Sequence, residues 1–272
     1  MLPVTDIEAV MSRVYGKDVS VFEKSFLAKS VERRILLLNG ISKKPYAEVL
    51  SEDENEANIF FDSLTINYSE FFRNPLSFAL LEKTVLPRLI KDKIQNSGIR
   101  IWSAGCAAGQ EAFSLAMVAD ELIRKQDKSI NLRIFGTDIS EKSLAIAIKG
   151  KFETSELGNV YLRRILEYFD HRGDIYTVSD HLKSSINFSL YDLLDANSVS
   201  PAASIFGDFD LICCCNVLFY YGKEIRQAIL NKLYFSLSPK GFLITGDAEC
   251  EIVPKDKFRP VFPSAAVFQK IW

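Results

Sequence analysis

The hydrophobic pattern changes near residue 99 of this 272-residue chain. Before that point, apolar residues recur at helical spacing. The run from Phe22 to Leu38 is one example, and it stops at Asn39-Gly40, a common helix end. Ser51 followed by acidic residues predicts a helix to about Leu64, and Asn74-Pro75 predicts the start of another, to about Leu86. The first part of the chain is therefore expected to be helical.

After residue 99, short apolar runs alternate with helical patterns, which predicts an α/β fold with a mostly parallel sheet covered by helices on both faces. The predicted strands are Ile99–Ser103, Leu132–Thr137, Ile186–Leu190, Phe209–Cys214, Phe242–Gly246 and Ala266–Ile271. The predicted helices are Glu111–Arg124, Glu141–Lys149, Tyr161–Phe169 and Lys223–Leu237. Between them, the segment from Gly173 to Leu182 predicts a short hairpin inserted before the third main strand.

A turn of small residues, with Gly105 and Gly109, joins the first predicted strand to the helix that follows. A strand that ends in a glycine turn and leads into a helix is the opening unit of a nucleotide-type site. Small residues are needed there because a cofactor must approach the backbone closely. The turn lacks both the Gly-Lys-Ser/Thr ending and the third glycine of the dinucleotide fingerprint. Triphosphate and pyrophosphate binding are therefore not favoured.

Asp138 stands at the end of the second predicted strand. An acid at this place in the fold accepts hydrogen bonds from ribose hydroxyls. The alternative is that Asp138 caps the helix that begins near Ser140. Because Ser140 can serve as that cap, we favour the ribose role.

The composition narrows the function classes. A net charge of −2 and 48% hydrophobic residues give no bias towards nucleic acid or a membrane surface. We see no signal peptide and no apolar run long enough to span a bilayer. The five cysteines include three adjacent ones and no C-x-x-C pair, so we expect no disulfide framework, no metal site and a reducing cytoplasm. The two histidines argue against a Ser-His or Cys-His nucleophile.

Motifs along nearly the whole chain match one family in order and spacing. They are RRI (33–35), NYSEFFRNP (67–75), WSAGCAAGQEAFSLAM (102–117), GTDIS (136–140), YDLL (191–194) and NVLFYY (216–221). On these motifs the chain resembles the CheR-type chemotaxis receptor methyltransferases, which use S-adenosylmethionine to methylate glutamate side chains on bacterial chemoreceptors. The resemblance implies a helical N-terminal domain, residues 1–73. It also implies a class I, Rossmann-like methyltransferase domain, residues 74–272, with an inserted β-hairpin at 170–184.

The resemblance also assigns the cofactor contacts. S-adenosylmethionine, or its product S-adenosylhomocysteine, is expected to contact Asn67, Ser69, Arg73, Gly105, Glu111, Asp138, Asp192, Leu193, Cys215 and Asn216. Two of these acids have alternative roles. Glu111 could instead be an acidic residue that is favoured near a helix N-terminus by the helix dipole. Asp192 could instead be a turn residue.

The chemistry implied by the resemblance needs positioning more than proton transfer. Glutamate has a solution pKa of roughly 4.3, so it is already a nucleophilic anion at neutral pH. The planar guanidinium of Arg73 suits a carboxylate, and the resemblance places it in the active site; the alternative is a salt bridge at a domain junction. Tyr220 matches a tyrosine near the substrate, and packing at a strand end is an equally weighted alternative.

The first helical segment carries a group of cations. Lys29 and Arg33 are four residues apart and share a helix face, which on spacing alone indicates a solvated surface. The resemblance makes Lys29, Arg33 and Arg34 a docking surface for the acidic helical bundle of a chemoreceptor. The short insert near Gly173 lacks a longer glycine-rich loop, so we expect no tethering to a receptor's C-terminal pentapeptide. We expect a cytoplasmic monomer that inserts into no membrane.

Several positions depart from the family pattern. Cys215 replaces an arginine, Asp192 an asparagine, Gln110 a glutamate and Asp247 a histidine. The leading hypothesis is an active glutamate O-methyltransferase. The second is a catalytically impaired regulatory or scaffold protein that binds the cofactor or its product. A third, a methyltransferase for a small molecule or nucleic acid, is weakened for nucleic acid by the lack of a basic stripe beyond the N-terminal helices.

Overall fold

The computed structural model describes residues 4–38, 44–65, 68–95, 97–126, 129–205, 207–263 and 265–271, which form two compact units. The first unit runs to residue 66 and includes Phe219–Gln227; the second unit holds the rest. The division falls before the predicted boundary at 73, because Phe71 and Phe72 are buried in the core of the second unit. No helix of the described residues is both long and apolar enough to cross a membrane.

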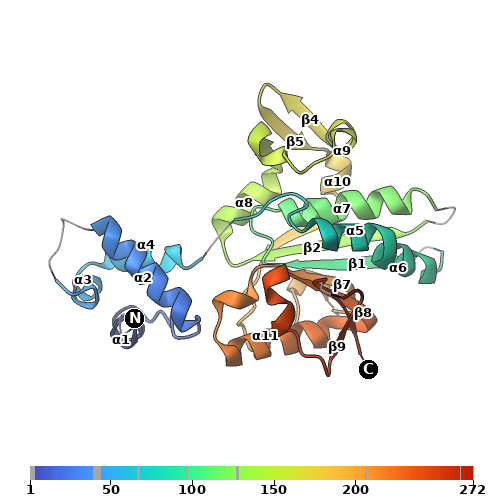
Figure 1. The fold of residues 1–272 in the computed structure, drawn as a ribbon. Helices are drawn as coiled ribbons and strands as arrows, with labels where there is room; N and C mark the ends of the chain where they lie inside the picture. Colours follow the sequence, from blue (N-terminus) through green and yellow to red (C-terminus); the bar gives the residue numbers. More distant parts are fainter. Residues whose placement is uncertain are drawn as a thin grey trace. The chain divides into compact units, whose positions relative to one another are not determined.

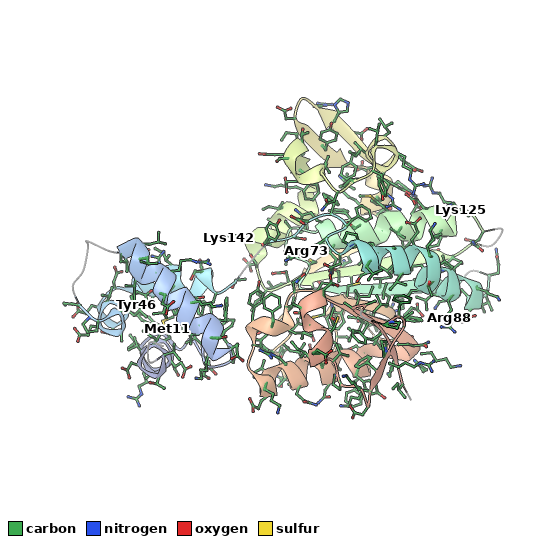
Figure 2. The ribbon with its side chains drawn as sticks, in the orientation of Figure 1. Met11, Tyr46, Arg73, Arg88, Lys125 and Lys142 are labelled. Carbon is green, nitrogen blue, oxygen red and sulfur yellow. The ribbon has the colours of Figure 1, made fainter. Side chains whose placement is uncertain are left out.

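Four helices form most of the first unit (Figure 1): α1 (Thr5–Tyr15), α2 (Lys24–Leu38), α3 (Tyr46–Glu52) and α4 (Glu54–Ser63). Their apolar faces meet in a core that includes Met11 and Tyr46, both labelled in Figure 2. The predicted helix start at Ser51 is wrong, since Ser51 lies within α3 and donates to the Glu48 carbonyl at 2.8 Å. The α4 cap is Asp53, whose carboxylate accepts from a backbone N–H. The predicted stop at Asn39-Gly40 lies outside the described residues.

A segment far along the chain completes the first unit. Tyr221 stacks on Phe22, with ring centroids 5.6 Å apart, and Tyr220 packs against Phe26 at 4.9 Å. The backbone N–H of Glu23 donates to the Tyr220 carbonyl at 2.8 Å, and Glu23 also pairs with Arg226 at 3.2 Å. This segment begins at the end of the 3₁₀ turn η4 (Leu218–Tyr220) and runs into α11 (Lys223–Ser236).

The second unit contains a seven-stranded sheet of order β6-β2-β1-β7-β8-β10-β9. The strands are β1 (Gly98–Ala104), β2 (Asn131–Asp138), β6 (Ile186–Leu190), β7 (Phe209–Cys214), β8 (Leu237–Thr245), β9 (Phe258–Pro260) and β10 (Val267–Lys270). The sheet is parallel except for β10, which runs antiparallel to both of its neighbours. The strand order reverses between β1 and β7, as in doubly wound nucleotide-binding sheets. The predicted Rossmann-like α/β fold is confirmed.

Helices cover the sheet in layers. α5 (Pro75–Leu80), the π-helix η1 (Leu81–Val85), α6 (Leu86–Asp92) and α7 (Gln110–Ile123) lie on one side (Figure 1). α8 (Glu141–Lys149) packs along β2 and β6. The helix predicted from Pro75 does begin there, but a π-helical turn interrupts it and its last part reaches Asp92. The Asn74 side chain makes no capping hydrogen bond.

The inserted hairpin belongs to a second, three-stranded antiparallel sheet of order β3-β5-β4. Its strands are β3 (Lys151–Glu153), β4 (Phe169–Arg172) and β5 (Ile175–Val178). β4 and β5 are joined by a tight turn in which Gly173 has a φ of 58°. The remaining elements are α9 (Leu162–Tyr168), α10 (Asp180–Lys183), η2 (Thr154–Leu157), η3 (Ala202–Ser204) and η5 (Asp247–Ile252).

Candidate active site

A cleft of about 520 Å³, its open mouth included, lies in the second unit. It is lined by Tyr68, Ser69, Glu70, Arg73, Asn74, Ser77, Phe78, Leu81, Gly105, Glu111, Cys213, Cys215, Asn216 and Ile244. The parallel strands β1 and β7 both end here, where ligands bind in open α/β sheets. Ser69, Arg73, Gly105, Glu111, Cys215 and Asn216 were all predicted to contact the cofactor, and the fold brings them together. Asn67 lies outside the described residues.

The turn after β1 brings the backbone close to the cleft. Gly105 has a φ of 80°, and a Cβ at this position would lie 2.6 Å from Cγ2 of Val217. The backbone N–H groups of Gly105 and Cys106 both donate to the Thr137 carbonyl, at 2.8 and 2.9 Å. These bonds fix the turn against the end of β2. Glycine is therefore required at this position both for its conformation and for its lack of a side chain.

Asp138 holds the same turn from the end of β2. One carboxylate oxygen accepts from the Ala107 N–H at 2.8 Å and the other from the Ser140 N–H at 2.9 Å. Ser140 is the N-cap of α8, since its hydroxyl accepts from the Ser143 N–H. The alternative in which Asp138 caps this helix is therefore wrong. Each carboxylate oxygen has two acceptor positions, so hydroxyl donors of a ligand can still bind to Asp138.

Two more predicted cofactor residues lie next to Asp138. The Tyr191 N–H donates to the Asp138 carbonyl at 3.0 Å, which brings the segment after β6 to the end of β2. In that segment Asp192 accepts from the Leu194 N–H at 2.8 Å, so it does act as a turn residue. Leu193 is buried. Asp138, Asp192 and Leu193 thus form a group at one end of the sheet, outside the lining of the cleft.

Glu111 is a half-buried acid that lines the cleft. It accepts a hydrogen bond from the Ser103 hydroxyl at 2.6 Å, and the nearby Cys215 thiol donates to the Ile244 carbonyl at 3.9 Å. Burial raises the pKa of the Glu111 carboxyl. The Ser103 and Cys215 side chains and the nearby Arg73 charge oppose that rise, and the Glu249 charge adds to it. No cation among the described residues forms an ion pair with it. A positively charged group of a ligand would therefore be stabilised beside this carboxylate.

Arg73 is the cation of the cleft (labelled in Figure 2). Its guanidinium lies 5.2 Å from the centroid of the Tyr68 ring and donates to the Tyr68 carbonyl at 3.5 Å. Within the described part of the chain Arg73 makes no salt bridge, which was the alternative role predicted for it. The residue before it, Phe72, has a φ of 52°. A bulky residue rarely adopts this conformation, which costs on the order of 1–3 kcal/mol.

Two side chains that line the cleft each hold a buried polar atom with no hydrogen-bond partner among the described residues: the hydroxyl of Ser77 and the side-chain oxygen of Asn216. A buried polar atom left unpaired costs about 1–3 kcal/mol, so a ligand that supplies partners gains from this arrangement. Asn216 was predicted as a cofactor contact, but Ser77 was not. In the sequence, Ser77 is marked only by its place four residues after Arg73, in the first turn of the helix predicted from Pro75.

The sequence also gave no role to Glu249. This buried acid accepts three backbone N–H groups: Gly246 at 2.7 Å, Asn216 at 2.9 Å and Leu218 at 2.7 Å. It thereby fixes the loop after β7 in the conformation that presents Asn216, which has a φ of 61°. Glu249 is a structural support of the cleft.

The remaining predicted residues lie in the first unit. Tyr220 packs against Phe26 there, and it is not part of the lining of the cleft. Lys29 and Arg33 are exposed on α2. Arg34 instead makes a two-pronged salt bridge to Glu56, with distances of 2.9 and 2.5 Å.

The groups of the second unit fit S-adenosylmethionine. Glu111 offers a carboxylate for the α-ammonium, Arg73 a guanidinium for a carboxylate, and Asp138 acceptors for the ribose hydroxyls. The backbone at Gly105 allows close approach, and the side-chain oxygen of Asn216, which has no partner in the described part of the chain, can accept from a further donor.

Comparison with known proteins agrees with this fit. Residues 67–266 match the family described as "CheR methyltransferase, SAM binding domain". The chain is 32% identical to chemotaxis protein methyltransferase 1 of Pseudomonas aeruginosa, over 83% of this chain and 82% of that protein. It is 30% identical to the chemotaxis protein methyltransferase of Listeria monocytogenes, over 91% and 89%. An uncharacterised 104.1 kDa protein of Rhodobacter capsulatus is also 30% identical, but the chain spans only 25% of it.

Solved structures include partial matches. A TehB-like SAM-dependent methyltransferase from Corynebacterium glutamicum is 17% identical, with a TM-score of 0.38, over 68% of this chain and 87% of that one. The chain belongs to the CheR methyltransferase family, and S-adenosylmethionine is its cofactor.

Proposed function

We propose that this methyltransferase transfers the methyl group of S-adenosylmethionine to glutamate side chains on the cytoplasmic helical bundle of a chemoreceptor. The observation that carries the proposal is Arg73, a cation in the cleft with no salt bridge to any described residue. A guanidinium in that state is available to a carboxylate ligand, and it binds one in a defined orientation.

The residues of the cleft support a reaction without a general base. The cofactor supplies an electrophilic methyl group on a sulfonium. A glutamate side chain is ionised at neutral pH, so no residue has to remove a proton from it. Arg73 would orient that carboxylate, and Glu111 would hold the cofactor's ammonium. Positioning of this kind is the main contribution that the protein can make to a direct displacement.

The exposed face of α2 supports a helical partner. Lys29 and Arg33 are exposed at successive turns, and Leu36 and Leu37 follow with exposed fractions of 68% and 64%. A surface that combines cations with apolar side chains suits an acidic amphipathic bundle. Arg34 is left out of the proposed docking face, because its side chain is paired with Glu56.

We also propose that the enzyme does not tether itself to a receptor's C-terminal pentapeptide. The turn between β4 and β5 consists only of Gly173 and Asp174, since β4 ends at Arg172 and β5 begins at Ile175. So short a connection offers no extended loop to hold a peptide. Titration with such a pentapeptide should give no heat of binding, and measurable affinity would contradict this part of the proposal.

The docking face is tested by reversing two charges. In Lys29→Glu with Arg33→Glu, we expect KM for a receptor cytoplasmic fragment to rise about tenfold, while Kd for S-adenosylmethionine changes less than twofold. The control reverses two exposed cations of the second unit, Arg88 and Lys125, and makes the same change in net charge (Figure 2). An equal rise in KM with the control pair would show a general charge effect and reject the docking face.

The competing candidate is a catalytically impaired protein that binds the cofactor without turnover, and Cys215 is the observation that favours it. Of the four departures from the family pattern, Cys215 is the one that lines the cleft. Asp192 and Asp247 lie outside it, and Gln110 donates to Glu156 at 3.1 Å. Methyl transfer from labelled cofactor to receptor fragments separates the candidates. Micromolar binding with no transfer to any fragment would support the impaired protein.

A further inference from the structure

The conformation at Phe72 determines where Arg73 lies. Phe72 is buried and has a φ of 52°, so the chain makes a left-handed turn immediately before Arg73. A phenylalanine does not hold such a conformation unless its surroundings fix it. The backbone N–H of Phe72 donates to the Ser114 hydroxyl at 3.1 Å, and its ring packs edge-on against Phe78 at 5.0 Å.

A second contact of the Phe72 ring is made by a buried charged side chain, Arg164. The guanidinium carbon of Arg164 lies 4.8 Å from the ring centroid, and Arg164 is 2% exposed. A buried cation requires compensation. Glu121 of α7 provides it with two hydrogen bonds, at 2.7 and 2.9 Å, and Glu82 of η1 adds a third at 3.4 Å.

Arg164 therefore connects three elements around one aromatic ring. It lies on α9, Glu121 on α7 and Glu82 on the π-helix. Its planar guanidinium is fixed by the two acids, and its central carbon lies over the Phe72 ring at a distance typical of cation–π contacts. Neither Arg164 nor its acids line the cleft.

We infer that Arg164 is a positioning residue for methyl transfer: by clamping the Phe72 ring, it fixes the left-handed turn that presents Arg73 to the cleft. The inference rests on the proposed role of Arg73 in binding a carboxylate or the cofactor. If the clamp loosens, the turn can relax to an ordinary conformation, and Arg73 then leaves its place beside Glu111.

A double-mutant cycle tests this. Kd for S-adenosylmethionine and kcat/KM for a receptor fragment are first measured in Arg73→Ala, and the quantity that changes is used as the readout. Arg164→Lys keeps the charge but loses the planar, two-pronged geometry. We expect it to change this readout at least fivefold in the wild-type background and less than twofold in the Arg73→Ala background. Phe72→Leu, which removes the aromatic ring but keeps an apolar side chain, should behave in the same way.

Arg163→Lys is the matched control. Arg163 also pairs with Glu121, at 3.2 Å, but its side chain is 59% exposed, and within the described residues the cation over the Phe72 ring is Arg164. It should leave the readout within twofold. Equal losses for Arg164→Lys in both backgrounds would show a purely structural role and overturn the inference. If Arg73→Ala changes neither quantity, the proposed role of Arg73 is rejected, and the inference with it.

Discussion

Glu111 is the carboxyl of the cleft whose raised pKa should make cofactor affinity depend on pH. Burial raises the pKa of its carboxyl, so the group becomes neutral at a higher pH than an exposed glutamate. As the pH falls through this raised pKa, the attraction for the cofactor's ammonium is lost, and Kd should rise. Hydrogen bonds to charged groups contribute about 1.5–3 kcal/mol, so a rise of roughly tenfold or more is expected. Titration calorimetry between about pH 4.5 and 7 measures this change in Kd. The cofactor's α-amino group stays protonated over this range, because it titrates at higher pH.

Glu111→Gln should abolish this pH dependence and weaken binding at pH 7 to the level of the wild type in acid. Glu70→Gln is the control, since Glu70 also lines the cleft but accepts a hydrogen bond from the Tyr68 hydroxyl. It should leave the pH dependence unchanged. A pH dependence that persists in Glu111→Gln would assign the effect to another group.

At the residue scale, the sequence predicted the groups whose role follows from a local pattern. Gly105 and Asp138 stand at fixed places in a strand–turn–helix unit, so they could be found without a structure. Arg164 and Glu249 could not, because their roles depend on Phe72 and Asn216, which are far from them along the chain. Arg34 resembled its exposed neighbours in sequence, and only the fold shows its salt bridge to Glu56.

At the element scale, the turn between β1 and α7 should tolerate no side chain at Gly105. In Gly105→Ala, the left-handed conformation costs about 1–2 kcal/mol, and the new Cβ would also overlap Val217. We expect a lower melting temperature and a loss of cofactor affinity. Gly158→Ala is the control, because Gly158 has a φ of −54° and open space where its Cβ would be. This change should be neutral or slightly stabilising, and equal effects of the two substitutions would contradict the argument.

Some elements of the structure were not predicted from the sequence, and each omission has a physical reason. β3 and β9 have three residues each, too few to show a period of two. The π-helical turn at 81–85 carries the same apolar spacing as the α-helices on either side, so its widened hydrogen bonding left no mark in the pattern. Ser51 and Asp53 are both good cap residues. Asp53 is the cap in the structure, because its carboxylate accepts a hydrogen bond from the Glu56 N–H.

At the scale of the whole molecule, the alternation of strands and helices predicted the sheet, since parallel strands need crossover connections. It did not predict that Phe219–Gln227 belongs with the first unit, because that grouping depends on ring contacts to Phe22 and Phe26. A boundary drawn at one place along the chain could not describe such a unit.

The two units have separate hydrophobic cores, and the cleft lies wholly in the second. A ligand stabilises the unit that binds it, by about 2.7 kcal/mol at a concentration one hundred times its Kd. For a unit of this size that corresponds to a rise in melting temperature of about 5–10 °C. We therefore expect calorimetry to resolve two transitions, of which S-adenosylmethionine raises only the one assigned to the second unit. The substitution Glu56→Gln identifies the transition of the first unit. It leaves the Arg34 guanidinium without its carboxylate partner, so it should lower the melting temperature of that transition alone. A cofactor-induced rise in that other transition would show that the two units unfold cooperatively.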